Sequence, residues 1–140
     1  MNNELTVGFP SLSRNESLAR GVAAQFVSLM DPTVEELSDV RTAVSEAVTN
    51  AIVHGYGGAG GTVTMKLVSE GDLFTVTVSD EGRGIGDIER AMKPFYTTDP
   101  QSERSGLGFS VMEAFMDSVS VVSAPGEGTS VTMKKLLRRE

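Results

Sequence analysis

The sequence predicts a two-layer α+β sandwich in which helices cover one face of a mainly antiparallel mixed sheet. Two observations lead to this class. Runs of alternating apolar and polar residues, typical of half-buried strands, occur near both ends of the chain and in its middle. Three other segments repeat apolar residues at helical spacing. The chain has 140 residues, the usual size of one domain, so we expect a single domain over residues 1–140.

The N-terminal part of the chain predicts a strand followed by a helix. Residues 5–9 alternate between apolar and polar types, which favours an opening strand. Either Ser13 or Asn15 has a side chain suited to cap the helix that follows. This helix should run to Met30, because Pro32 then breaks the pattern.

A second helix is expected to open with a capping box, since Thr33 is followed three residues later by Glu36. It should run to His54, because residues 55–61 are too rich in glycine to continue it. The remaining elements are expected to be two strands joined by a hairpin turn (62–68, 70–72 and 73–79), a helix (107–116) and two strands (119–122 and 129–133). Residues 80–108 form a long glycine-rich segment, and such segments are usually functional.

Composition excludes several classes of function. The chain has no cysteine and one histidine, which rules out disulfides, cysteine metal sites and multi-histidine sites. Its net charge of -7 argues against nucleic-acid binding, and the basic stretch that contains Lys134, Lys135, Arg138 and Arg139 is interpreted as a solvated tail. No apolar run approaches the ~20 residues of a membrane span. The polar start has no signal-peptide pattern, so we expect a cytoplasmic protein.

Three polar residues of the second helix are candidates for chemistry. Glu46, Asn50 and His54 follow each other at four-residue spacing, so they should share one helical face. A carboxylate can take a proton from a hydroxyl, and an amide oxygen is a suitable ligand for Mg²⁺. The spacing alone is more typical of a solvated polar stripe with a histidine that favours the helix C-terminus.

Further candidates follow strands or open a helix. Asp80 ends a strong strand and precedes a glycine-rich turn, where it could hold an amino group by a charge-assisted hydrogen bond. Residues 105–108 open the third helix and resemble an anion site, although no Walker A sequence is present. Thr129 starts the last strand and could reach the same group as Asp80. Taken singly, these features are also typical of an ordinary turn, a glycine cap and a strand residue.

The order of these motifs resembles the GHKL ATPase family, which includes DNA gyrase, heat-shock chaperones, MutL and histidine kinases. The motifs are residues 45–56, the Asp-x-Gly-x-Gly turn at 80–84, and the glycines of 106–108 and 128–129. Residues 46–56, 92–98 and 103–109 are most similar to the anti-sigma-factor serine kinases of sporulation. A histidine kinase would also need a phospho-accepting helical region upstream, which we do not expect in a chain of 140 residues.

The resemblance implies an ATP- and Mg²⁺-dependent protein serine kinase. Glu46 would be the base on a serine hydroxyl, Asn50 the Mg²⁺ ligand, and Asp80 the residue that reads the adenine amino group. Residues 87–105 would form a lid, with Arg104 meeting the γ-phosphate. The ATP site implied by the resemblance consists of Asn50, His54, Asp80, Gly82, Gly84, Ile85, Gly86, Thr98, Arg104, Ser105, Gly106, Leu107, Gly108 and Thr129.

The resemblance also implies the partners. The chain would sequester a sporulation sigma factor of the sigma F type and phosphorylate its anti-anti-sigma (STAS-domain) antagonist, so controlling transcription. A homodimer is expected, with Glu16 and Arg20 on the partner-binding face. That pair is equally typical of a surface ion pair. Two other hypotheses stay open: a binding module that uses ATP only to set its shape, and a stand-alone ATPase of the gyrase or MutL type.

Overall fold

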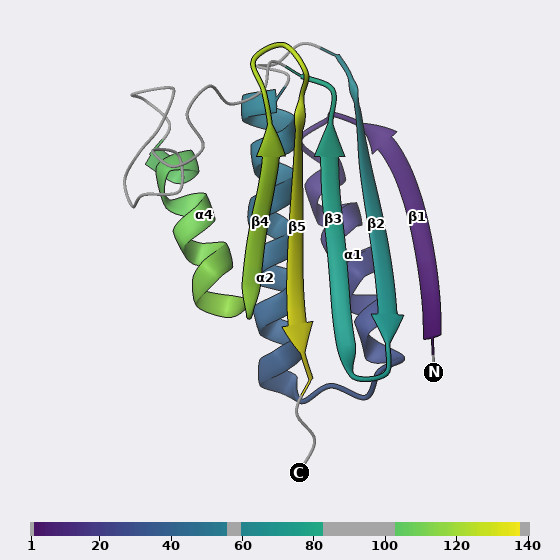
Figure 1. Cartoon of the computed structure of the whole chain (residues 1–140). Coiled ribbons are helices and arrows are strands. Elements are labelled where there is room, and N and C mark those ends of the chain that lie inside the picture. Colours follow the sequence, from purple (N-terminus) through teal and green to yellow (C-terminus); the bar gives the residue numbers. More distant parts are fainter. Residues whose placement is uncertain (1, 56–59, 83–102, 138–140) are drawn as a thin grey trace.

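The computed structural model describes residues 2–55, 60–82 and 103–137, with side chains in the last range from Gly108 onward. Figure 1 shows their arrangement. The elements are β1 (Asn2–Pro10), α1 (Asn15–Ser28), α2 (Val34–Asn50), the π-helix η1 (Ala51–Gly55), β2 (Thr62–Glu70), β3 (Leu73–Asp80), α4 (Glu103–Phe115), β4 (Ser118–Ser123) and β5 (Thr129–Leu136). No helix in these ranges is both long and apolar enough to cross a membrane.

The five strands form one sheet in the order β1-β2-β3-β5-β4. All four pairings are antiparallel, so no parallel pair occurs among the described strands. The α-helices among the described residues lie on one face of this sheet, with α2 in the middle, α1 toward the β1 side and α4 beyond the β4 edge (Figure 1). The predicted two-layer α+β sandwich is therefore confirmed.

The core lies between the helices and the inner face of the sheet. Leu67, Val76 and Met133 are register partners on three neighbouring strands, and each is 0% exposed. Val40 and Val44 of α2 are also fully buried. Burying one such side chain contributes about 1.5–3 kcal/mol. Along β2 and β3 buried residues alternate with less buried ones, and the buried side chains of these strands join those of α2 in one core.

The two long helices begin differently. In α2 the predicted capping box is present: the Glu36 amide donates to Thr33 Oγ1 (3.1 Å), and the Thr33 amide donates to Glu36 Oε1 (2.9 Å). The prediction that Ser13 or Asn15 caps the first helix is wrong. No side chain caps α1, and the Asn15 side-chain amide instead donates to the carbonyl of Pro10 (2.9 Å). This bond directs the Asn15 side chain toward the end of β1 and not toward the first turn of α1.

The end of α2 also differs from the prediction of one helix to His54. The α-helix stops at Asn50, and the chain continues for five residues as the π-helix η1. A π-helical segment bonds residues five apart and is frequent at functional sites. The third predicted helix starts earlier than residue 107, at Glu103.

The two helix starts give a matched test. Thr33→Ala removes the side-chain acceptor of a capping box and should lower the free energy of unfolding by about 1 kcal/mol. Ser13→Ala changes a residue whose side chain caps nothing, and should change stability by less than about 0.5 kcal/mol. Urea denaturation of both variants measures the difference. Equal losses would contradict the assignment of the caps.

Candidate functional site

The site lies where the C-terminal end of α2, the end of β3 and the start of β5 meet at one end of the molecule (Figure 1). On the α2 side, Gly108 of α4 packs against two polar side chains. A Cβ atom at Gly108 would lie 3.0 Å from Asn50 Nδ2 and 3.4 Å from Glu46 Oε2. Glycine at this position therefore lets the backbone of α4 approach the amide and the carboxylate closely.

The side chain of Asn50 is the most unusual polar group of the site. Its Nδ2 and Oδ1 atoms are both buried, and neither has a hydrogen-bond partner among the described residues. An unsatisfied buried polar group costs about 1–3 kcal/mol, and native proteins rarely leave one without a reason. Glu46 Oε2 is buried beside this amide. The pair therefore offers one neutral and one acidic oxygen ligand or hydrogen-bond acceptor to a bound group.

Asp80 forms the second part of the site, at the end of β3. It is 9% exposed, and Oδ1 accepts a hydrogen bond from the Gly82 amide (2.9 Å). Burial raises the pKa of this carboxyl above 3.8, while the backbone amides of Gly82 and Thr129 pull the pKa back down. A buried carboxylate with donors on one side is suited to accept a further hydrogen bond from a ligand amino group.

Two glycines bring these parts together by backbone contact. A Cβ at Gly82 would lie 1.8 Å from the carbonyl oxygen of Gly55, and a Cβ at Gly55 would lie 2.6 Å from Asp80 Cγ. No other residue fits at either position without moving the backbone or Asp80. Gly55 was not among the predicted site residues. In the sequence, Gly55 is the first residue after the predicted end of the second helix, and this position indicates only where the helix stops.

Thr129 lies beside Asp80, as predicted, because the two are register partners of β5 and β3. The Ser123 hydroxyl donates to the carbonyl of Gly128 (2.7 Å) and lies 2.8 Å from Thr129 Oγ1. Since Ser123 has a single hydroxyl hydrogen, Thr129 donates to Ser123 and its own oxygen keeps acceptor capacity. The sequence does not predict a role for Ser123, because it follows the strand predicted at 119–122 and lies far from Asp80 along the chain.

The structure changes the interpretation of two predicted positions. Gly106 and Gly108 lie inside α4, which begins at Glu103, rather than in a turn before it. The free amides of a helix belong to its first turn, so residues up to Ser105 would supply them. His54 lies in η1, so the four-residue spacing that aligns Glu46 with Asn50 does not extend to it.

Other predicted site residues are placed only in part. Gly84, Ile85, Gly86 and Thr98 lie outside the described residues, as does most of the predicted lid at 87–105. The backbone of residues 104–107 is helical, and their side chains lie outside the described part of the chain.

The predicted partner-binding pair lies on a different helix. Glu16 and Arg20 of α1 form an i,i+4 ion pair at 3.6 Å. In Figure 1, α2 lies between their helix and α4. The structure therefore keeps this pair apart from the site around Asn50.

Known proteins share this architecture and sequence. Residues 9–135 match the family model of the histidine kinase-like ATPase domain. An anti-sigma F factor from Clostridium acetobutylicum is 53% identical over 135 residues, which cover 96% of this chain and 94% of that protein. One from Bacillus licheniformis is 47% identical over 140 residues, covering 99% and 96%.

A solved structure supports the fold at lower identity. The RsbU and RsbW domains of a Mycobacterium tuberculosis protein superpose with a TM-score of 0.72 at 19% identity, covering 98% of this chain and 32% of that one. The predicted resemblance to GHKL proteins is confirmed by the family match. The chain therefore belongs to the histidine kinase-like ATPase family and, within it, to the anti-sigma F factors, so it carries a kinase-type ATP-binding domain.

Proposed function

We propose that the chain is an anti-sigma factor that also acts as an ATP-dependent protein serine kinase. It would sequester a sigma factor of the sigma F type and phosphorylate a serine of its anti-anti-sigma (STAS-domain) antagonist. The relatives named anti-sigma F factor support the partner class. The observation that carries the kinase chemistry is the buried Asn50 amide, which has no partner in the described part of the chain and lies beside Glu46.

The two parts of the site suit the two ends of ATP. Asp80 and Thr129 both offer acceptors, which fits an adenine amino group with two hydrogens. At the other part, the Asn50 oxygen would hold Mg²⁺, which in turn would neutralise phosphate charge. This cation usually takes one or two protein ligands together with substrate phosphates. Among the described residues, no cluster of three acidic or histidine side chains is suited to a metal ion.

The proposed reaction moves one phosphoryl group and one proton. The serine oxygen of the antagonist bonds to the γ-phosphorus, the bond to the β–γ bridging oxygen breaks, and ADP leaves with its electron pair. Glu46 takes the hydroxyl proton. Arg104 would stabilise the charge on the transferred group, and the first turn of α4 would donate its free amides to phosphate. Residues 87–105 would close over the nucleotide.

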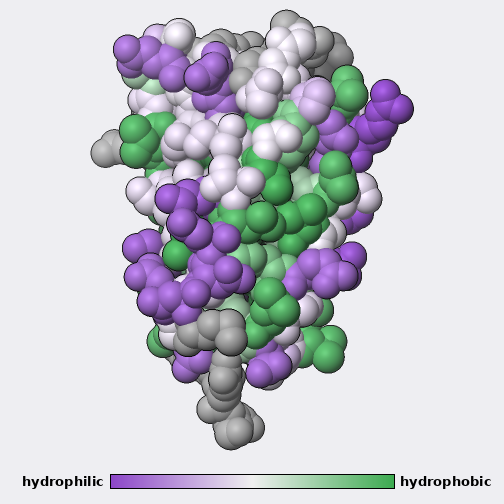
Figure 2. Space-filling model, turned by 90° about the vertical axis from the view of Figure 1, so that its right-hand side faces the viewer, coloured by the Kyte–Doolittle hydropathy of each residue, from purple (hydrophilic) through white to green (hydrophobic). Residues whose placement is uncertain are grey.

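The surfaces proposed to bind a second copy of the chain and other protein partners lie at the β1–α1 edge, away from α4 (Figure 1). Figure 2 shows apolar side chains gathered over the edge made by β1 and α1. This β1–α1 groove is lined in part by Leu5, Leu18 and Leu29, which are 40%, 58% and 65% exposed. Among the described strands β1 pairs only with β2, so its other edge is open. These features support a homodimer through the groove, with Glu16 and Arg20 nearby on α1 available to a cytoplasmic partner.

A label-transfer assay separates the three hypotheses. With γ-labelled ATP, Mg²⁺ and a STAS-domain antagonist, a kinase produces labelled serine. A module that uses ATP only for its shape produces none but still binds the sigma factor. A stand-alone ATPase releases phosphate steadily without any protein acceptor. Each outcome excludes the other two as the main activity, and running the assay with and without sigma factor shows whether sequestration and transfer are linked.

Glu46→Gln should keep ATP binding and lower the rate of phosphoryl transfer by about 10²–10⁴-fold, because an amide cannot take the serine proton. Glu35→Gln is the matched control, since Glu35 is an exposed carboxylate in the first turn of the same helix. Quench-flow measurement of phosphoserine tests the pair. A normal rate in Glu46→Gln would remove Glu46 as the base.

Asp80→Asn should change how stability depends on pH. The pKa of Asp80 is raised in the folded protein above its value of 3.8 when unfolded. Its stability contribution is therefore complete below 3.8 and is lost as pH rises through the folded pKa. The free energy of unfolding of the wild type, relative to Asp80→Asn, should fall as pH rises from acid to neutral. Urea denaturation at several pH values checks the sign, and a difference that grows with pH would contradict it.

Leu18→Glu should dissociate the proposed homodimer by placing a charge in the β1–α1 groove. Val122→Glu is the control, because Val122 is 72% exposed on β4 at the other edge of the sheet. Sedimentation equilibrium measures the mass of both variants and the wild type. A wild-type monomer, or a dimer that persists in Leu18→Glu, would exclude this interface.

A further inference from the structure

Helix α4 runs antiparallel to α2 and meets it at two points that lie far apart along both helices. The first is Gly108, which packs against Glu46 and Asn50. The second is the C-terminal end of α4 at Phe115. One side chain contacts both Phe115 and Asp39 of α2 and so connects the two helices. On each helix the two points are seven positions apart, or ~10 Å. Asp39 and Glu46 therefore lie on the same face of α2.

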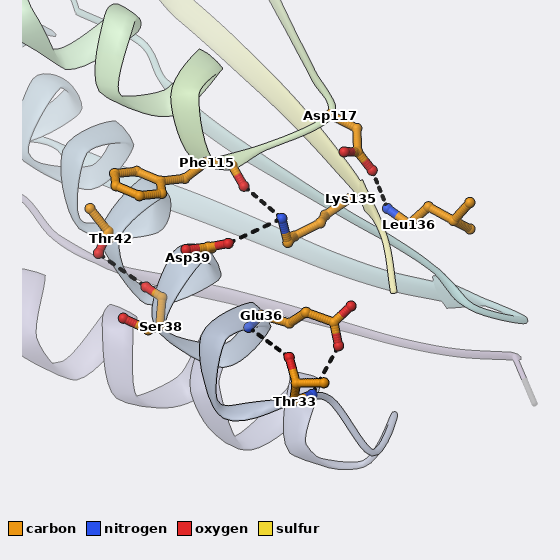
Figure 3. Close-up of polar contacts among 9 residues, drawn as sticks. All are labelled: Thr33, Glu36, Ser38, Asp39, Thr42, Phe115, Asp117, Lys135 and Leu136. Atoms are coloured by element: carbon orange, nitrogen blue, oxygen red, sulfur yellow. Dashed lines mark hydrogen bonds and ion pairs between the residues drawn. The ribbon is translucent and has the colours of Figure 1, made fainter. Parts of the chain in front are cut away.

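The bridging side chain is Lys135 of β5 (Figure 3). Its Nζ donates to the carbonyl oxygen of Phe115 (2.8 Å) and lies 3.4 Å from Asp39 Oδ2. The side chains of Lys135 and Asp39 are only 13% and 20% exposed. A lysine this far buried is usually held by specific partners, and here the partners come from two different helices.

Lys135 contradicts the interpretation of the basic residues as a solvated tail, because it lies in β5. It follows Val131 and Met133 on the inner, apolar face of the sheet, whereas its neighbour Lys134 points to the exposed face. Helix α4 has no basic residue in its own last turn. Lys135 supplies the cation that favours the negative end of a helix and satisfies one of its last carbonyl groups.

Two further bonds hold the chain just after α4. The Asp117 amide donates to the carbonyl of Lys134 (2.9 Å), and Asp117 Oδ2 accepts from the Leu136 amide (2.6 Å). Both tie the turn to β5, as Figure 3 shows for the second. Neither reaches α2. Among these contacts, the contact of Lys135 with Asp39 is the one that also fixes α4 relative to the helix that carries Glu46 and Asn50.

We infer that Lys135 is a positioning residue for the nucleotide site. By holding the C-terminal end of α4 to Asp39, it sets where Gly108 at the other end lies against Asn50 and Glu46. It touches no substrate, and it acts through the rigid length of α4 between the two points. The inference rests on the proposed function in one respect, namely that the Gly108 end of α4 contacts ATP phosphates.

Lys135→Met tests the inference, because it keeps the length of the side chain and removes the cation. Lys134→Met is the matched control, since it removes a cation from the adjacent, exposed position of the same strand. Hydrogen exchange without nucleotide should show amides of residues 108–115 exchanging about tenfold faster in Lys135→Met, with β2 and β3 unchanged. The Kd for Mg-ATP should rise about tenfold, the range of one charge-assisted hydrogen bond. The control should match the wild type in both measurements.

The outcomes separate this inference from the proposed function. Equal exchange in the two variants, or faster exchange spread evenly over β2 and β3, would overturn the role of Lys135 in holding α4. Faster exchange in α4 with an unchanged Kd would overturn its role in positioning. A wild type that binds no ATP would instead refute the proposed function. If Lys135→Met does not fold, Asp39→Ala carries the same test, because it removes the carboxylate that ties Lys135 to α2 and keeps the bond to Phe115.

Discussion

Contact between the backbone of η1 and the turn after β3 is the constraint on which the site depends. The carbonyl of Gly55 occupies the space in which Gly82 would otherwise carry a side chain, and Gly55 itself lies against the Asp80 carboxylate. Because backbone atoms meet here, neither side can shift independently of the other. Gly55 also lies five residues after Asn50 on the same continuous helical segment. The contact therefore sets the distance between the part of the site that holds Asp80 and the part that holds Asn50.

Both parts of the site contain polar groups that the fold has removed from water. Burial raises the pKa of Asp80, and the Asn50 amide is buried with no partner among the described residues. In an ordinary core these groups would be replaced by apolar residues or satisfied by neighbours. The surrounding apolar core offsets their cost, since α2 is held by fully buried side chains such as Val44 and Val48. A ligand that supplies the missing hydrogen bonds would recover part of that free energy on binding.

Helix α4 joins the site from a different direction. It packs on α2 at the β4 edge of the sheet, as Figure 1 shows, so its placement depends mainly on helix–helix contacts. Met112 is fully buried between the two points where α4 meets α2. Gly108 permits close approach at one end, and Lys135 with Asp39 holds the other. This arrangement lets a residue on the last strand influence the position of a glycine at the nucleotide site.

The sequence by itself determined the class of fold, most strands and helices, the capping box at Thr33 and the pair formed by Glu46 and Asn50. These features depend on local periodicity and side-chain chemistry, which are readable along the chain. Only the tertiary structure decided that α2 continues into a π-helix and that Gly55 touches Asp80. The same holds for the hydrogen bond between Ser123 and Thr129 and for the contacts by which Lys135 connects α4 to α2. Each of these joins residues that are distant in sequence or departs from α-helical spacing. The physical reason is that a backbone contact or a buried ion pair depends on how whole elements pack, which no local pattern encodes.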